Sequence, residues 1–216
     1  MRILIGQPLH EEKIEQLECE IKNNNSIDTV IFPEGYLSSE TILRKACELA
    51  KEYFVNIITS YRRDDRDRAV IINSLGDIVL DRPKTPPEEE IEIYEPSLVN
   101  LQGRTIGYLL CMEILKGARD LEKIKEKIDF IVHPIGVGMF SNEQFEQWIN
   151  EAKYIAKKYH TMTIGTSHSD GSYRNCGISI PISYFIDRNG EEIFISKSDA
   201  RTRIINLDTK EVKSIM

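Results

Sequence analysis

The stretch IGYLLCME at residues 106–113 places a cysteine, Cys111, at the end of an apolar run. The run has the length of a buried strand, and residues 115–127 have helical spacing, so the sequence predicts Cys111 at a strand-to-helix turn. Residues just beyond the carboxyl ends of strands are where α/β sheets build their sites. The N-terminus of a helix also lowers the pKa of a nearby thiol, which favours the nucleophilic thiolate. Cys111 is therefore the first candidate for a reactive residue.

Two other predicted strands end at an ionisable residue. Glu34 follows the strand at 29–32, and Lys84 follows the strand at 78–80. Lys84 lies in an irregular stretch, 82–97, of the kind that compact domains keep mainly when it serves a function. Each residue also has an ordinary interpretation: an inert core cysteine, a glutamate in a turn and a surface lysine. Taken one at a time, none of the three indicates a catalytic site.

The order of elements predicts one α/β domain over residues 1–216. Strands alternate with helices early in the chain, and hairpins are interspersed, which favours mixed sheets over a purely parallel one. We expect two packed sheets covered by helices. The predicted helices span 10–22, 39–54, 115–127 and 141–159, and the predicted strands span 2–7, 29–32, 56–61, 69–73, 78–80, 98–100, 105–111, 130–134, 161–167, 177–186, 192–195 and 201–206. The charged stretch 62–67 is predicted to be a solvated turn.

Composition excludes several classes of partner. The 216 residues carry 28 Lys+Arg against 35 Asp+Glu, a net charge of −7, with no basic block. This argues against nucleic acid or an anionic membrane surface as the main partner. No apolar run approaches the ~18 residues that span a bilayer, and the N-terminus does not have the pattern of a signal peptide. The four scattered cysteines lack a C-x-x-C pair, so a reducing cytoplasm is the expected location.

Three segments, taken together, resemble the nitrilase superfamily of carbon–nitrogen hydrolases. VIFPEGYL at 30–37 is similar to the family's glutamate motif, RPKTP at 82–86 to its lysine motif, and IGYLLCME at 106–113 to its cysteine motif. Their order is the family order. DFIVHP at 129–134, the helix around Trp148 and ISYFIDRNG at 182–190 are similar to later family elements. The resemblance covers nearly the whole chain and implies a four-layer α-β-β-α sandwich.

The resemblance implies a catalytic triad of Glu34, Lys84 and Cys111. Hydrolysis of an amide or nitrile needs a nucleophile, a base that prepares it and a positive charge for the developing oxyanion. Cys111 would form a thioester, and Glu34 would move the protons. Lys84 would stabilise the oxyanion together with the backbone N–H of Met112. An amidase is favoured over a true nitrilase, with a small linear amide or N-carbamoyl compound as substrate, ammonia as product and no cofactor.

Further site residues follow from the same resemblance. Some amidases of the superfamily carry a second glutamate eight residues after the lysine, which here is Glu92. Glu88, Glu89 and Glu90 could be placed in that role as readily, or the whole stretch could be a charged loop. Tyr36 and His133 are predicted to contact substrate, although His133 stands where the family commonly has Asn. The chain also has Lys116-Gly117-Ala118 where the family often shows an aromatic–Pro–Glu turn.

Two other classes of function stay open. Cys111 could be oxidised in a redox or stress protein that pairs Glu with a strand-to-helix Cys, or the chain could bind a ligand without hydrolysing it. Cys176 could be an exposed, oxidisable loop cysteine.

The four histidines form no His-x-x-x-His pair, so no metal site is expected. Family members usually associate through the helices beside the nucleophile, so the resemblance implies a homodimer or a larger homo-oligomer.

Overall fold

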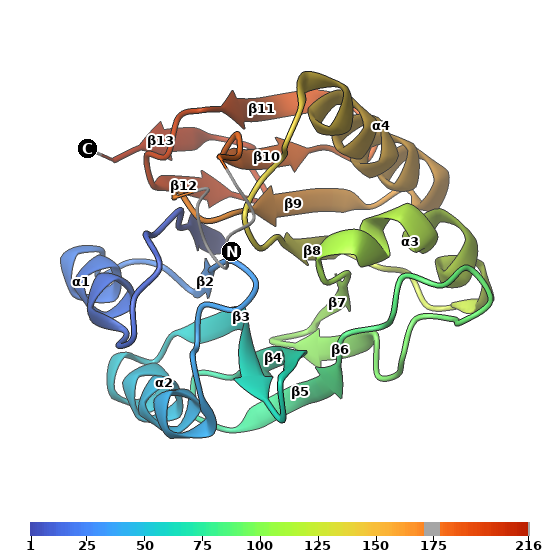
Figure 1. The fold of residues 1–216 in the computed structure, drawn as a ribbon. Helices are drawn as coiled ribbons and strands as arrows, with labels where there is room; N and C mark the ends of the chain where they lie inside the picture. The colour runs from blue at the N-terminus through green and yellow to red at the C-terminus, as the bar shows by residue number, and fades with distance from the viewer. Residues whose placement is uncertain (171–177, 216) are drawn as a thin grey trace.

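The computed structural model describes residues 1–170 and 178–215. Two mixed sheets form its centre (Figure 1). The first has the order β13-β12-β1-β2-β3-β4-β5, in which β1, β2 and β3 are parallel and the other neighbours antiparallel. Its strands are β1 (Arg2–Ile5), β2 (Thr29–Ile31), β3 (Asn56–Arg63), β4 (Arg66–Ile72), β5 (Ile78–Pro83), β12 (Arg203–Asn206) and β13 (Val212–Ser214).

The second sheet has the order β11-β10-β9-β8-β7-β6. Strands β7, β8 and β9 are parallel, and the remaining pairs are antiparallel. Its strands are β6 (Leu98–Leu101), β7 (Arg104–Tyr108), β8 (Phe130–Pro134), β9 (Met162–Thr166), β10 (Ile182–Ile186) and β11 (Glu192–Lys197). Each sheet therefore has a parallel centre whose carboxyl ends can build a site.

Helices cover the outer face of each sheet, which makes four layers. Figure 1 shows α1 (Glu15–Asn23) and α2 (Glu40–Tyr53) on one side, and α3 (Ile114–Asp120) and α4 (Asn142–Tyr159) on the other. Two 3-10 turns, η1 (Cys111–Glu113) and η2 (Leu121–Lys123), flank α3. The predicted α-β-β-α sandwich is confirmed.

Alternation along the inner strands divides the core into layers. In β1, Ile3 and Ile5 pack between the two sheets, whereas Leu4 packs under α1 and α2. In β2, Ile31 faces the space between the sheets and Val30 faces the helices. Because strands of the parallel centre are covered on both faces, they have continuous apolar sequences. A third cluster joins the second sheet to α3 and α4 and includes Trp148.

Two predicted helices need correction at their boundaries, and one strand was not predicted. The helix predicted over 10–22 begins at Glu15, because the His10 N–H bonds the Asp170 carboxylate at 3.1 Å and keeps that segment out of the helix. The helix predicted over 115–127 ends at Asp120 and passes into η2, since the charged run after it offers little apolar surface to bury. Strand β13 is exposed throughout, without the alternation that reveals a strand.

Strand β10 begins at Ile182 rather than at residue 177, and Gly177 lies outside the described residues. The predicted turn at 62–67 is instead the tip of the β3–β4 hairpin, whose pairing continues to Arg63 and Arg66. Within residues 1–170 and 178–215, no helix is both long and apolar enough to cross a bilayer.

Candidate active site

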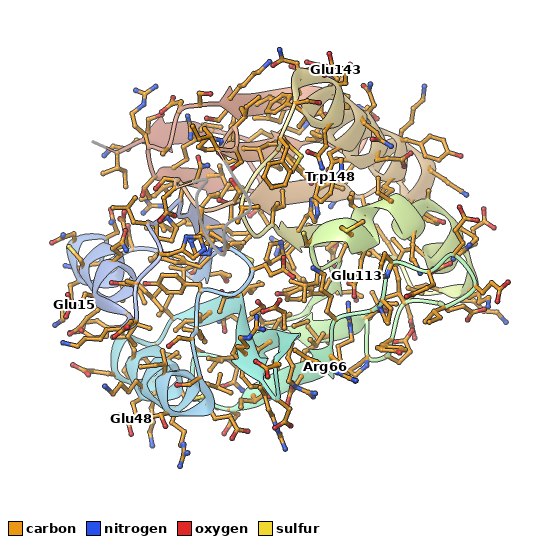
Figure 2. The ribbon with its side chains drawn as sticks, in the orientation of Figure 1. Glu15, Glu48, Arg66, Glu113, Glu143 and Trp148 are labelled. Atoms are coloured by element: carbon orange, nitrogen blue, oxygen red, sulfur yellow. The ribbon has the colours of Figure 1, made fainter. Side chains whose placement is uncertain are left out.

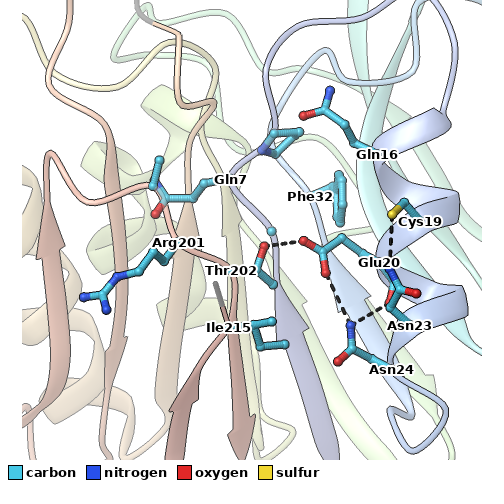
Figure 3. A pocket seen from close by; sticks show the side chains of 13 residues that line it. Gln7, Gln16, Cys19, Glu20, Asn23, Asn24, Phe32, Arg201, Thr202 and Ile215 are labelled. Carbon is cyan, nitrogen blue, oxygen red and sulfur yellow. Dashed lines mark hydrogen bonds between the residues drawn. The ribbon is translucent and has the colours of Figure 1, made fainter.

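Two cavities differ in what lines them. The larger, about 700 Å³, lies between α1 and the segment before β12, and Figure 3 shows its lining. None of the three predicted catalytic residues lines it, and its polar side chains bond one another, as Thr202 Oγ1 does with Glu20 Oε1 at 2.5 Å. The smaller cavity, about 220 Å³, is lined by Glu34, Lys84 and Cys111 together. The smaller cavity is therefore the candidate active site.

Each of the three predicted catalytic residues reaches this cavity from the end of a strand. Glu34 follows β2 after Phe32 and Pro33, and Lys84 follows β5 directly, both in the first sheet. Cys111 begins η1, shortly after β7 of the second sheet. The site thus lies where the two sheets meet, and it depends on how they pack.

Glu34 and Lys84 form a close ion pair. Lys84 Nζ lies 2.6 Å from Glu34 Oε1, although the contact lacks the alignment of a hydrogen bond. The Glu34 side chain is 8% exposed and that of Lys84 is 27% exposed. Burial raises the pKa of Glu34 against the opposing effect of the Lys84 ammonium, and Asp67 raises it further. Burial would lower the pKa of Lys84, but the Cys111 and Glu34 side chains outweigh burial and raise it.

The Cys111 side chain is partly buried, and its thiol resists ionisation. Burial raises its pKa to about 12, and the Glu34 carboxylate contributes in the same direction. The Lys84 ammonium and the Gly136 backbone N–H oppose this shift. The expectation of a pKa lowered by a helix N-terminus is wrong, because η1 has only three residues, α3 only seven, and burial dominates. The resting site therefore holds a neutral thiol beside a carboxylate–ammonium pair.

Solved structures of carbon–nitrogen hydrolases have the same architecture as this chain. No family model and no curated protein sequence matches the chain. A carbon–nitrogen hydrolase from Helicobacter pylori G27 superposes with a TM-score of 0.75 at 14% identity, covering 97% of this chain and 90% of that one. An amidase variant from Nesterenkonia sp. AN1, with acrylamide added to its active-site cysteine, gives 0.76 at 11% identity and covers 95% and 92%. The chain has the carbon–nitrogen hydrolase fold.

A third structure of this fold is a CN-hydrolase superfamily protein from Xanthomonas campestris with an arsenic adduct in its active site. Its TM-score is 0.70 at 13% identity, covering 100% of this chain and 90% of that one. At such identities the likeness concerns the fold, so the chemistry of the present chain is argued from its own residues.

Gly136 is a site residue that the sequence did not single out. It follows β8 and lines the cavity, and a Cβ built on it would lie 2.9 Å from Glu34 Oε2. The preceding residue is tied to the base, since the Glu34 N–H donates to the Ile135 carbonyl at 3.2 Å. A glycine is needed here for the close approach of the glutamate.

Asp67 is the second missed residue. It stands in β4 beside the hairpin tip, lines the cavity, and its carbonyl accepts the Lys84 N–H at 2.8 Å. Its carboxylate affects the pKa of both Glu34 and Lys84. The pairing of Arg68 with Pro83 would have indicated this placement, but that register is not visible in the sequence.

Glu92 is not brought to the cavity, so its predicted supporting role needs correction. Its side chain is 63% exposed and pairs with Lys123. The loop is held in this course by Lys116, whose buried amine donates to the Glu88 and Ile91 carbonyls. The second acidic residue of the cavity lining, after Glu34, is Asp67, whose carboxylate contributes to the raised pKa of Lys84.

Tyr36 and His133 are also placed away from the cavity surface. The Tyr36 hydroxyl donates to Glu11 and accepts the Leu17 N–H at 3.0 Å, and the ring is 1% exposed. His133 is fully buried, its Nε2 donates to the Cys111 carbonyl at 2.8 Å, and Nδ1 bonds the Tyr184 hydroxyl. Burial lowers the pKa of His133 to about 4, so the ring stays neutral. The prediction of substrate contacts for these two residues therefore needs correction.

The remaining walls of the cavity are largely apolar. Met112, whose backbone N–H is predicted to support the oxyanion, lies in the wall and is 43% exposed. The lining also contains Val137, Phe140, Gln144 and Trp148. The cavity therefore combines the charged side chains of Glu34, Lys84 and Asp67 with mostly apolar ones.

His10, His168 and Asp170 form a cluster of side chains of the types that bind metal ions. Among residues 1–170 and 178–215, donor atoms of His10, His168 and Asp170 lie within 4.8 Å of one another. The two rings stack with centroids 3.5 Å apart, and His10 Nδ1 lies 2.5 Å from Asp170 Oδ1. His168 Nε2 donates to the Glu34 carbonyl at 3.0 Å. These hydrogen bonds support the backbone of Glu34. Cys176 lies outside the described residues.

Proposed function

We propose that the protein hydrolyses a small linear amide or an N-carbamoyl compound through a cysteine thioester. The observation that carries this proposal is the meeting of Cys111 with the Glu34–Lys84 ion pair in one cavity of about 220 Å³. A nucleophile, a proton carrier and a fixed cation are the groups that acyl transfer requires. The small cavity supports a small substrate.

In the first half of the reaction, Cys111 Sγ bonds the carbonyl carbon while Glu34 accepts the thiol proton. The raised pKa of the thiol means that this proton leaves only as the bond forms. The negative oxygen is stabilised by Lys84 and by the backbone N–H of Met112. Collapse of this intermediate breaks the C–N bond, and Glu34 gives its proton to the departing nitrogen.

In the second half, water attacks the thioester and Glu34 accepts a proton from it. The second tetrahedral intermediate expels the thiolate, which recovers a proton from Glu34, and a carboxylic acid leaves. Glu34 thus accepts a proton twice and donates one twice in each turnover. A carboxyl group with a raised pKa is better suited to this exchange than one with the ordinary pKa.

A redox role receives less support from the same residues. Oxidation by peroxide proceeds through the thiolate, and burial works against that species at Cys111. The redox interpretation also gives no task to Lys84, which the site holds 2.6 Å from Glu34.

The test is ammonia release over a panel of ω-amides, carbamoyl amines and aliphatic nitriles. We expect turnover of at least one amide or carbamoyl compound, and Cys111→Ala should abolish it. Cys47→Ala is the matched control, because Cys47 is a partly buried free cysteine on α2, away from this cavity. Turnover that survives Cys111→Ala, or no turnover on any compound, contradicts the proposal.

We further propose that the chain acts as a cytoplasmic homodimer or larger homo-oligomer. Support comes from Leu115 on α3 and Tyr154 on α4, which are apolar and 39% and 54% exposed on the helices beside the nucleophile. Light scattering on the purified protein tests this: a monomer at micromolar concentration would contradict it.

A further inference from the structure

Glu113, two residues after the nucleophile, has a carboxylate with four hydrogen-bond donors around it. Oε1 accepts from Arg82 Nη1 at 2.8 Å and from the Thr85 N–H at 2.7 Å. Oε2 accepts from Arg82 Nη2 at 2.7 Å and from the Leu110 N–H at 2.6 Å. The Glu113 and Arg82 side chains are each 1% exposed. Figure 2 labels Glu113 in the interior, near the start of α3.

The donors belong to the segments that carry two of the triad residues. Arg82 lies in the last part of β5 of the first sheet, and Thr85 follows that strand. Lys84 stands between these two residues in the sequence. Leu110 directly precedes Cys111, after β7 of the second sheet. One carboxylate therefore joins the segment with the ammonium to the segment with the thiol, across the boundary between the sheets.

The guanidinium of Arg82 extends the same connection. Nη1 donates to the Pro83 carbonyl at 3.1 Å, and Nη2 donates to the Tyr108 carbonyl at 3.1 Å. The cation also lies 5.9 Å from the centroid of the Tyr108 ring. Since Pro83 precedes Lys84 and Tyr108 ends β7, Arg82 too contacts both sheets.

The backbone at the nucleophile requires such support. Cys111 has φ of 53°, in the left-handed region that side chains other than glycine rarely adopt. The peptide after Cys111 is held by His133 at the Cys111 carbonyl, and the backbone one peptide before it is held by Glu113 at the Leu110 N–H. Strained backbone of this kind persists where the surroundings determine it, and it gathers at functional sites.

We propose that Glu113 is a positioning residue that fixes the Lys84 ammonium relative to the Cys111 thiol. The catalytic meaning of this role rests on the proposed function, but the geometric role does not. Glu113 does not line the cavity. A carboxylate is the side chain that suits the position, because it only accepts hydrogen bonds and offers about four lone pairs for the four donors. A glutamine at this position would place its NH2 group, which is itself a hydrogen-bond donor, against two of these donors.

The test measures the alkylation rate of Cys111 by iodoacetamide across pH 7–10, with adduct formation at Cys111 followed by mass spectrometry. Lys84→Met defines the effect of losing the cation, and it should slow alkylation because Lys84 lowers the thiol pKa. Glu113→Gln should shift the profile in the same direction, with at least a threefold slower rate at pH 8. It should also reduce kcat at least tenfold with a smaller change in KM.

Asp81→Asn is the matched control. Asp81 lies on β5 next to Arg82 and accepts from Arg68 Nε at 2.8 Å, outside the cavity lining. It should leave the alkylation profile unchanged even if it lowers the melting temperature. If Glu113→Gln does not fold, Glu113→Asp keeps the charge but shortens the reach by one methylene, and the same shift is expected.

A folded Glu113 variant with the wild-type alkylation profile, measured beside a shifted Lys84→Met, overturns the proposal. The assay needs no substrate. If the wild type hydrolyses nothing while the Glu113 variants shift the profile as Lys84→Met does, the positioning role stands and the proposed hydrolase function fails.

Discussion

Gly136→Ala should displace Glu34, the proposed general base, without removing any group that takes part in the proposed chemistry. The new Cβ would lie 2.9 Å from Glu34 Oε2. A comfortable carbon–oxygen contact is several tenths of an ångström longer, so the carboxylate must shift by roughly 0.5 Å. It cannot move freely, because it is buried and held 2.6 Å from Lys84 Nζ. The variant keeps the Gly136 N–H, so no hydrogen-bonding group of the site is removed.

A misplacement of 1 Å at a reacting group can cost about 100-fold in rate, so a shift of half that size should cost about tenfold in kcat/KM. That loss corresponds to about 1.4 kcal/mol of transition-state stabilisation. Crowding of a well-packed site should cost roughly 1–3 kcal/mol of folding free energy. The assay is ammonia release with the substrate found in the panel, together with urea unfolding.

Gly107→Ala is the matched control for this prediction. Its Cβ would also meet a neighbour at 2.9 Å, but that neighbour is Ile131 Cγ1 in the apolar layer. It should lower stability by a similar amount and leave kcat/KM within about threefold of wild type, since surface and core changes away from the site act mainly on folding. A folded Gly136→Ala enzyme with wild-type kcat/KM would refute the argument that this glycine is needed for the close approach of Glu34.

Three further predictions concern the charges at the site. Because burial raises the pKa of Cys111 to about 12, its alkylation rate should rise about tenfold per pH unit from pH 7 to 10; a plateau below pH 10, as an ordinary thiol gives, would contradict this. Glu34→Gln should lower kcat at least 100-fold while the protein still binds substrate, as judged by calorimetry; unchanged kcat would remove Glu34 from the mechanism. Glu92→Gln should leave kcat/KM within about twofold, whereas Asp67→Asn should change it at least fivefold; the opposite ranking would restore Glu92 to the site.

The placement of Glu34, Lys84 and Cys111 in one cavity could be predicted because each of them follows a recognisable strand. The apolar runs before Glu34 and Cys111 are buried strands whose alternation and length are visible in the sequence, and Lys84 follows a third. The order of the three motifs supplied the remaining information. We inferred that the three side chains converge because each stands at a strand end, and in the structure all three line one cavity.

The residues that sequence reasoning missed depend on register and on tertiary contacts. Asp67 lies 17 positions before Lys84 and reaches it only because β4 pairs with β5 in one particular register. Glu92 had the expected spacing, but its loop has no periodic pattern, and buried Lys116 sets its course. His133 was predicted to contact substrate, but its ring is buried and donates to the Cys111 carbonyl, a tertiary contact that the sequence does not show.

The division of the site between two sheets explains why so many buried polar contacts surround it. Glu34 and Lys84 follow strands of the first sheet, and Cys111 and Gly136 follow strands of the second. Apolar packing between the sheets is strong but not directional, so by itself it tolerates small displacements that catalysis does not. Directional contacts across the boundary, from Glu113 to the Thr85 N–H and from Glu34 to the Ile135 carbonyl, restrict those displacements. Because a buried ion pair contributes little to net stability, selection for geometry explains the Arg82–Glu113 pair in this network better than selection for stability does.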